Sequence, residues 1–233
     1  MIDLLKTSFQ KQEANQKPLI VEFLGPAGAG KTTLLRALKQ SHPNIKEGVI
    51  ANEIDCIPYL ITNTLLFFPT FISQYQHTRW FTWKETRSMI YTQVWHEILE
   101  REKDNKNLAI LFDHGPLFRL ARLLACGPDI TKSPIYQEWS NKILAQWMNT
   151  LDIVVWLDAP NTVLLQRVHN RDTWHEVKEK SDIEGHNFLE NYRRVYEEII
   201  TQIKSNSPIK ILHFNTSEKS VEHIANETLM ALI

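Results

Sequence analysis

The sequence predicts an α/β fold in which helices cover both sides of a parallel sheet. Short apolar runs alternate with helical patterns along the chain, and the runs are apolar at nearly every position, as in strands that are buried on both faces. Successive parallel strands need a long return connection, and here each connection has helical character. We therefore expect a three-layer α/β/α sandwich.

Four runs have strong strand character, and a fifth is weaker. The four lie at 19–24, 108–113, 152–157 and 209–214, and the fifth lies near 47–53. Helices are expected at 30–41, 59–76, 84–103, 117–126, 134–149, 160–170, 186–205 and 218–232. The polar pieces 100–107 and 172–182 are expected to be a solvated turn and a mobile flap. Because no repeat or flexible linker divides the chain, residues 1–233 are predicted to form one domain with its core at 18–233.

Composition indicates a soluble protein without a global electrostatic field. Lys and Arg number 26 against 27 Asp and Glu, so a general affinity for nucleic acid is not expected. The two cysteines lack metal-site spacing, and the N-terminus lacks the pattern of a secretory signal, which together favour a cytoplasmic protein. The apolar segment Ile57–Ile72 is shorter than a membrane-spanning helix and contains Pro58 and Pro69, so we expect a buried helix or pocket wall rather than a span. The alternative is a face that binds a membrane surface or a partner.

The stretch "GPAGAGKT" follows the first predicted strand and opens a predicted helix. It matches the phosphate-loop pattern G-x-x-x-x-G-K-[ST]. In this motif backbone N–H groups surround phosphate oxygens, the lysine reaches the β- and γ-phosphates, and the next hydroxyl binds Mg²⁺. We therefore expect ATP and Mg²⁺ as cofactors. The predicted nucleotide-binding residues are Gly25, Ala27, Gly28, Ala29, Gly30, Lys31, Thr32 and Thr33.

Asp113 ends the strand predicted at 108–113, at the sheet edge where open α/β sheets bind ligands. A carboxylate there can hold Mg²⁺ together with Thr32 or accept a proton from a substrate hydroxyl. The following "HGP" differs from the D-x-x-G of a GTPase, and a motor ATPase usually has a glutamate where His114 stands. Nucleotide hydrolysis as the main reaction is therefore disfavoured.

The helix after the strand at 152–157 contains Arg167 and Arg171 one turn apart. Side chains at this spacing share a helix face, and two guanidinium groups so placed suit a transferring phosphoryl group. His175, Lys178 and Lys180 follow in the polar flap. We therefore predict that Lys31, Asp113, Arg167 and Arg171 are the catalytic residues.

Together, the phosphate loop, the aspartate-ended strand and "LDAP…R…R" resemble the nucleoside and nucleotide kinase group of phosphate-loop proteins, with thymidylate kinases and deoxynucleoside kinases as the nearest named relatives. The resemblance spans about residues 18 to 233. It implies a five-stranded parallel sheet of order 2-3-1-4-5 and transfer of the γ-phosphoryl group to a small-molecule acceptor. It also implies a helical lid at 167–182 that carries Arg167 and Arg171. The chain departs from thymidylate kinases at Ala27 and His114, where those enzymes typically have an acidic residue and an arginine.

The acceptor side is expected in the aromatic-rich segment 53–96, which follows the second strand. Candidate acceptor-binding residues are Glu53, Asp55, Arg87 and Arg119, and Glu53 or Asp55 matches the position of the carboxylate base of deoxynucleoside kinases. The acceptor could be a nucleoside or a nucleoside monophosphate. Which of Asp113, Glu53 and Asp55 acts as base depends on distances that the sequence does not contain.

Three functions are consistent with these patterns, and the leading one is an ATP- and Mg²⁺-dependent kinase. The alternative is a nucleotide-binding regulatory or assembly protein that docks a partner through 57–72. A sulfotransferase-like reader of a nucleotide bisphosphate is disfavoured, because the lysine–threonine pair suits a triphosphate with a metal. Two copies could also pair as a homodimer.

Overall fold

The computed structural model describes residues 17–101 and 108–232. In these residues five parallel strands form one sheet in the order β2-β3-β1-β4-β5. The central strand β1 (Leu19–Leu24) pairs with β3 (Ala109–Phe112) and β4 (Ile153–Asp158), while β2 (Ile45–Glu47) and β5 (Lys210–Asn215) form the edges. The predicted α/β fold and its strand order are confirmed.

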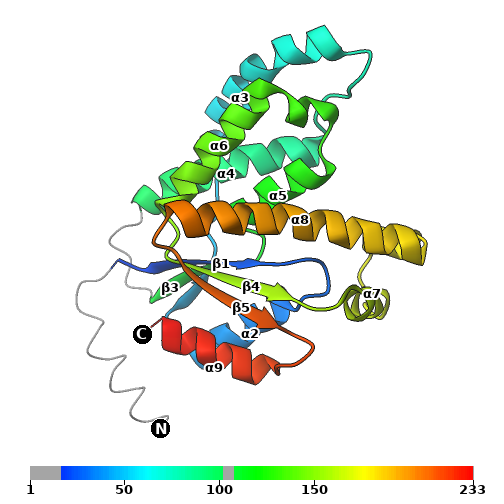
Figure 1. The fold of residues 1–233 in the computed structure, drawn as a ribbon. Helices are drawn as coiled ribbons and strands as arrows, with labels where there is room; N and C mark the ends of the chain where they lie inside the picture. The colour runs from blue at the N-terminus through cyan, green and yellow to red at the C-terminus, as the bar shows by residue number, and fades with distance from the viewer. Residues whose placement is uncertain (1–16, 102–107, 233) are drawn as a thin grey trace.

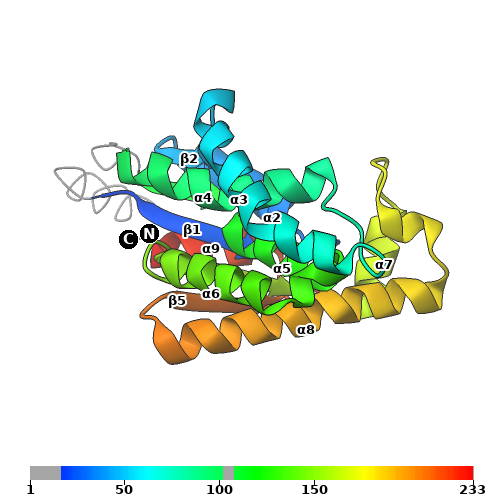
Figure 2. The same ribbon diagram turned by 90° about the horizontal axis from the view of Figure 1, so that it is seen from above.

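Helices cover both faces of the sheet, as Figure 1 shows. The helices α2 (Lys31–Ser41) and α9 (Val221–Ala231) lie on one face. The other face carries α4 (Trp83–Arg101), α5 (Pro116–Cys126) and α8 (Asp182–Asn206), with α3 (Glu53–Gln74) and α6 (Pro134–Met148) packed further out (Figure 2). The remaining elements are α7 (Asn161–His169) and two 3-10 turns, η1 (Asp129–Lys132) and η2 (Glu176–Glu179).

The connection between β2 and α3 differs from the sequence prediction. The weak strand expected near 47–53 is at Ile45–Glu47, and it ends at Gly48, whose φ of 51° lies in the left-handed region that favours glycine. The helix expected from residue 59 begins at Glu53 and continues through Pro58 and Pro69. The expected start was therefore too late, because a proline in a helix removes one backbone N–H donor without always ending the helix.

Capping residues set the starts of the last two helices. Ser181 and Glu184 form a reciprocal capping box, so α8 begins at Asp182 rather than near 186. Ser220 accepts a hydrogen bond from the backbone N–H of His223, so α9 begins at Val221. The polar turn predicted at 100–107 lies mostly outside the described residues.

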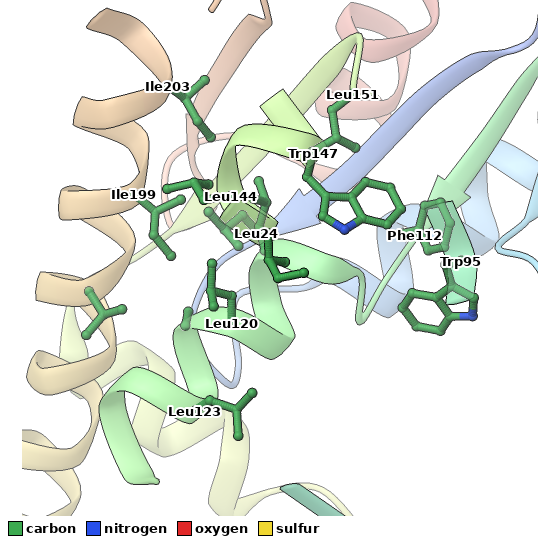
Figure 3. Close-up of a cluster of buried hydrophobic side chains, with 14 of the residues drawn as sticks. Leu24, Trp95, Phe112, Leu120, Leu123, Leu144, Trp147, Leu151, Ile199 and Ile203 are labelled. Atoms are coloured by element: carbon green, nitrogen blue, oxygen red, sulfur yellow. The ribbon is translucent and has the colours of Figure 1, made fainter. Parts of the chain in front are cut away.

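The larger of two apolar cores lies between the sheet and the helices α4, α5, α6 and α8. Figure 3 shows Trp147 of α6 beside Phe112 of β3 and Trp95 of α4. Trp147 is fully buried, and its indole Nε1 donates to the carbonyl of Thr92 at 2.8 Å. This bond satisfies the polar atom of the ring, so the tryptophan joins α6 to α4 without an unpaired buried donor.

Helix α3 is long and apolar enough to cross a membrane by length and composition. Its most apolar 18-residue window has a mean hydropathy of 1.4, and 11% of that window is buried. The helix nevertheless packs on α4 through a polar contact, because the amide Nδ2 of Asn63 donates to Gln93 at 2.8 Å. The predicted buried helix is wrong, because Asn63 and Phe67 are the only buried residues of α3. That the helix does not span a membrane stays a prediction.

Replacing Trp147 by alanine should destabilise the fold by about 3–5 kcal/mol, because the change opens a cavity in the core and removes the hydrogen bond that joins α6 to α4. Urea unfolding measures this free energy. Trp174→Ala is the matched control, since Trp174 is 69% exposed and its loss should change stability by no more than about 0.5 kcal/mol. Equal effects of the two substitutions would contradict the assigned role of Trp147.

Candidate functional site

The loop between β1 and α2 folds back against the neighbouring β4 and α7. Gly25 and Gly28 have φ angles of 145° and 88°. A Cβ atom at Gly25 would lie 2.1 Å from the carbonyl oxygen of Leu157, and one at Gly28 would lie 2.7 Å from that of Leu164. The loop therefore needs glycine at both positions for backbone conformation and for space.

Lys31 starts α2 and is 7% exposed. Its Nζ donates to the carbonyl oxygens of Gly25 at 2.6 Å and Pro26 at 3.0 Å, so the ammonium group folds over the loop. Burial lowers the pKa of Lys31 to about 8, and the nearby Asp113 carboxylate opposes part of that shift. An anion bound in the loop would stabilise the ammonium form.

Asp113 follows β3, and its Oδ2 accepts a hydrogen bond from Thr32 Oγ1 at 2.5 Å. Its other oxygen, Oδ1, is buried and has no hydrogen-bond partner. Mg²⁺ prefers oxygen ligands and usually keeps several waters, so a hydroxyl, a carboxylate and phosphate oxygens are a suitable donor set. The residues therefore fit Mg²⁺. In the described part of the chain no group of three or more His, Cys, Asp or Glu side chains forms a metal cluster, so the rest of the coordination would come from phosphate and water.

The two arginines of the predicted lid have different surroundings. The prediction that they share a helix face is wrong, because α7 ends at His169 and Arg171 lies beyond it. Arg167 donates to the carbonyl of Gly28 at 3.3 Å, to Thr216 Oγ1 at 2.8 Å and to the Thr216 carbonyl at 2.8 Å. It therefore joins the phosphate loop to the turn after β5. The exposed Arg171 lines two cavities beside the loop, so its guanidinium is the better placed of the two to meet a phosphate.

Two cavities flank the phosphate loop and share Gly28, Gly30 and Arg171. The Thr216 cavity has a volume of about 350 Å³, and the His114 cavity has a volume of about 130 Å³. The Thr216 cavity is lined by Gly28, Ala29, Gly30, Thr33, Leu34, Leu157, Arg167, Arg171, Thr216, Lys219, Val221 and Ile224. The His114 cavity is lined by Ala27, Gly28, Gly30, Lys31, Thr32, His114, Phe118, Arg122, Arg171, His175, Glu176, Phe188, Tyr192 and Tyr196. Of the eight predicted nucleotide-binding residues, all but Gly25 line one or both of these cavities.

A third cavity, the Glu53 cavity, lies between α3 and α4 and has a volume of about 490 Å³, within the usual range for small-molecule sites. It is lined by Glu53, Cys56, Ile57, Leu60, Trp83, Arg87, Ile90 and Tyr91. One carboxylate, one guanidinium and two aromatic rings thus face the same space.

Two other predicted acceptor residues lie outside the lining of this cavity. Asp55 forms an ion pair with Arg101 at 3.5 Å. The Arg119 guanidinium lies 5.0 Å from the ring centre of Tyr91 and 4.6 Å from that of Trp95. Burial lowers the pKa of Arg119 to about 10, which leaves it charged at neutral pH. The structure thus groups Glu53 with Arg87 and places Asp55 and Arg119 in contacts between helices.

Sequence reasoning missed Glu22, a fully buried carboxylate in the central strand. Its oxygens accept hydrogen bonds from the backbone N–H groups of Leu117 at 3.0 Å and Phe118 at 2.8 Å, at the start of α5. Burial raises the pKa of Glu22 to about 8, while these two bonds and Arg119 act in the opposite direction. A charged residue within the apolar run "LIVEFL" is the signal that could have revealed it.

By fixing the start of α5, Glu22 positions the residues on either side of Gly115. A Cβ atom at Gly115 would lie 2.6 Å from Glu22 Cδ, so glycine permits this close approach. His114 and Phe118 both line the His114 cavity, and their rings contact each other with centroids 4.5 Å apart. Burial lowers the pKa of His114, and Asp113 opposes the shift.

The predicted lid segment contributes His175 and Glu176 to the His114 cavity. It is anchored by the fully buried Val177, which packs in the second apolar core with Leu165. Burial lowers the pKa of His175 below its ordinary value. The buried Val177 thus anchors the segment between its polar residues. Movement of the segment as a lid stays a prediction.

The fold is similar to solved structures of two kinds of kinase. Thymidylate kinase from Candida albicans is 13% identical with a TM-score of 0.57, and the match covers 94% of this chain and 92% of that one. The deoxyadenosine kinase from M. mycoides with bound dATP is 17% identical with a TM-score of 0.54, and the match covers 91% of this chain and 98% of that one. The chain has the fold of nucleoside and nucleotide kinases. The structural resemblance predicted from the phosphate loop is therefore confirmed.

No family model matches the sequence of the chain, and no curated protein matches it either. The similarity is thus one of fold at low identity, and the residues of the site have to be interpreted from their own geometry.

Binding of ATP should take up protons at pH 8, because Lys31 is partly deprotonated in the free protein and a triphosphate favours its ammonium form. Uptake by Lys31 should decline toward pH 6.5, where it is already protonated. Calorimetric titrations in buffers of different ionisation enthalpy measure the number of protons taken up per ATP bound. Lys31→Arg is the control, because an arginine stays protonated throughout and should remove the uptake at pH 8. Uptake that is unchanged in Lys31→Arg would contradict the assignment to Lys31.

Proposed function

We propose that the protein is an ATP- and Mg²⁺-dependent phosphotransferase that moves the γ-phosphoryl group to a small-molecule acceptor, a nucleoside or a nucleoside monophosphate. The observation that carries the proposal is the group formed by the buried Lys31, the Thr32 hydroxyl and the Asp113 carboxylate with its unpartnered oxygen. Kinases of the same fold support it, since one of the similar structures contains bound dATP.

In this proposal the Thr216 cavity takes the nucleoside part of ATP, and the phosphates run along the loop toward the His114 cavity. Backbone N–H groups at the start of α2 and the ammonium of Lys31 would bind the phosphates. When bound, Mg²⁺ would neutralise charge on the phosphate oxygens, held by Thr32 and Asp113. Arg171 would approach the transferring group from the lid, while Arg167 keeps the loop in position.

The Glu53 cavity is the proposed acceptor site. Trp83 and Tyr91 offer aromatic surfaces for a planar base, and Arg87 and Glu53 offer polar groups of opposite charge. We assign Glu53 as the base that accepts the proton of the acceptor hydroxyl. Asp113 is already engaged with Thr32, and Asp55 with Arg101. This assignment chooses among the three carboxylates that the sequence leaves open.

Purified protein with ATP and Mg²⁺ should form ADP when a suitable nucleoside or nucleoside monophosphate is supplied. Lys31→Ala should lower kcat by about 100-fold to 1,000-fold, because the transition state loses a positioned charge. Lys142→Ala is a matched control, since the Lys142 side chain is 73% exposed and pairs with Glu138 on α6. A coupled assay of ADP release over an acceptor panel provides the measurement. ADP formation that is indifferent to every acceptor would contradict the proposal and favour the regulatory alternative.

Glu53→Gln should lower kcat by about 100-fold to 10,000-fold with little change in the affinity for ATP, because it removes the proposed base and leaves the phosphate loop intact. Asp55→Asn is the matched control on the same helical turn and should retain activity. Steady-state kinetics together with ATP binding by calorimetry separate the two effects. If Asp55→Asn lost activity while Glu53→Gln kept it, the base would be misassigned.

A further inference from the structure

The His114 cavity contains a cation that the proposed function has not used. Arg122 of α5 lines this cavity and is half-buried. In the described part of the chain, its guanidinium has no hydrogen-bond or ion-pair partner. Arg193 on the neighbouring α8 shows the contrast, because it pairs with Asp158 at 2.9 Å and with Glu190 at 2.8 Å. A partly desolvated charge without a partner is costly, so the surroundings of Arg122 favour a bound anion.

Positive charge from three separate elements meets at this cavity. Burial lowers the pKa of His175, and Glu176 opposes that shift. Three cations act on the imidazole in the same direction as burial: Arg171, Lys31 and Arg122. All three line the His114 cavity, so they surround one small space rather than separate parts of the surface.

A buried hydroxyl in the same cavity also lacks a partner. Tyr196 of α8 lines the cavity and is fully buried, and its Oη has no hydrogen bond within the described residues. Helices α5 and α8 lie side by side on one face of the sheet, as Figures 1 and 2 show. Buried polar atoms are nearly always paired in folded proteins, so the Tyr196 hydroxyl is suited to donate to a ligand oxygen.

The size and position of the cavity indicate which anion it takes. Its volume of about 130 Å³ is well below the range of about 300–1,000 Å³ that is usual for small-molecule sites, so it suits a single phosphoryl group rather than a whole nucleoside. The ring of Phe118 lies 5.8 Å from the Lys31 ammonium. Arg122 follows Phe118 by four residues and shares its face of α5, so this face brings Arg122 to the phosphate end of the site.

We propose that Arg122 is a further catalytic residue, whose guanidinium binds the phosphoryl group in transfer from the side of α5 while the Tyr196 hydroxyl donates to the same group. The inference rests on the proposed function, which supplies the γ-phosphoryl group. Arg122 and Arg171 then hold this group from two different parts of the chain, α5 and the segment after α7.

The proposed contact acts on the charge that develops during transfer. The bond from the γ-phosphorus to the oxygen of ADP breaks, the bond to the acceptor oxygen forms, and the acceptor proton passes to Glu53. Charge is then spread over the three equatorial oxygens of the phosphoryl group. The planar fork of an arginine can donate to two of these oxygens at once, which a lysine ammonium cannot do in the same geometry.

Arg122→Gln should lower kcat by about 100-fold to 1,000-fold and leave the affinity for ATP unchanged, because it removes a donor to the transition state. Tyr196→Phe keeps the buried ring and should lower kcat by about 10-fold, through the loss of one hydrogen bond. Arg194→Gln is the matched control, since Arg194 is 62% exposed on α8 and pairs with Glu198. Steady-state kinetics, ATP calorimetry and thermal melting measure these effects. An unchanged kcat in Arg122→Gln, or a loss confined to the KM of the acceptor, would overturn the proposal.

Chemical rescue distinguishes a contact with the phosphoryl group from a structural role. Millimolar guanidinium should restore part of the kcat of Arg122→Ala, because the free cation can occupy the space of the deleted side chain. It should leave Lys31→Ala unchanged. Absence of rescue in Arg122→Ala, together with a lowered melting temperature, would assign Arg122 a structural role instead.

A binding measurement separates this inference from the proposed function. Mg²⁺, ADP and aluminium fluoride together imitate a phosphoryl group in transfer, and the wild type should bind them about 100-fold more tightly than Arg122→Gln, with equal affinity of the two proteins for ADP alone. A wild type that forms no ADP with any acceptor would contradict the proposed function. Equal binding of the aluminium fluoride mixture by wild type and Arg122→Gln, or no binding by either, would overturn the role of Arg122.

Discussion

The close approach of the phosphate loop to the backbone of β4 and α7 is the constraint on which the rest of the site depends. Gly25 lies against the Leu157 carbonyl and Gly28 against the Leu164 carbonyl, with no room for a side chain at either position. This contact holds the loop against the carboxyl end of β4, the parallel neighbour of β1, and against α7. Arg167 strengthens the same contact by joining Gly28 to Thr216 beyond β5.

A buried carboxylate also helps to position the residues of the site. Glu22 lies inside the sheet and holds the start of α5, which in turn sets the positions of His114 and Phe118 beside Lys31. Removing charges from water is costly, so these groups persist only because each is hydrogen-bonded or lies near a group of opposite charge. The buried oxygen Oδ1 of Asp113 has no hydrogen-bond partner, while Oδ2 accepts from Thr32, the other residue proposed to hold a metal ion.

The sequence predicted the layers from local patterns and the strand order through the resemblance. The nucleotide-binding role of the loop residues follows from a local motif and stays a prediction. It did not separate Glu53 from Asp55, since neighbouring residues at the start of a helix point in different directions and only the packing against α4 distinguishes them. It treated Arg167 and Arg171 as a pair, although helical spacing alone does not reveal the carbonyl groups that engage Arg167. Glu22 was missed because its partners are 95 and 96 residues away in the chain.

The most direct test of the central claim is a crystal structure of the protein with Mg²⁺ and a non-hydrolysable ATP analogue. The account predicts that the phosphates lie in the nest formed by residues 25–33, that Lys31 leaves the carbonyl of Gly25 for a phosphate oxygen, and that the metal ion lies between Thr32 and Asp113. A nucleotide bound elsewhere, or a metal ion that contacts neither Thr32 nor Asp113 directly or through water, would contradict it.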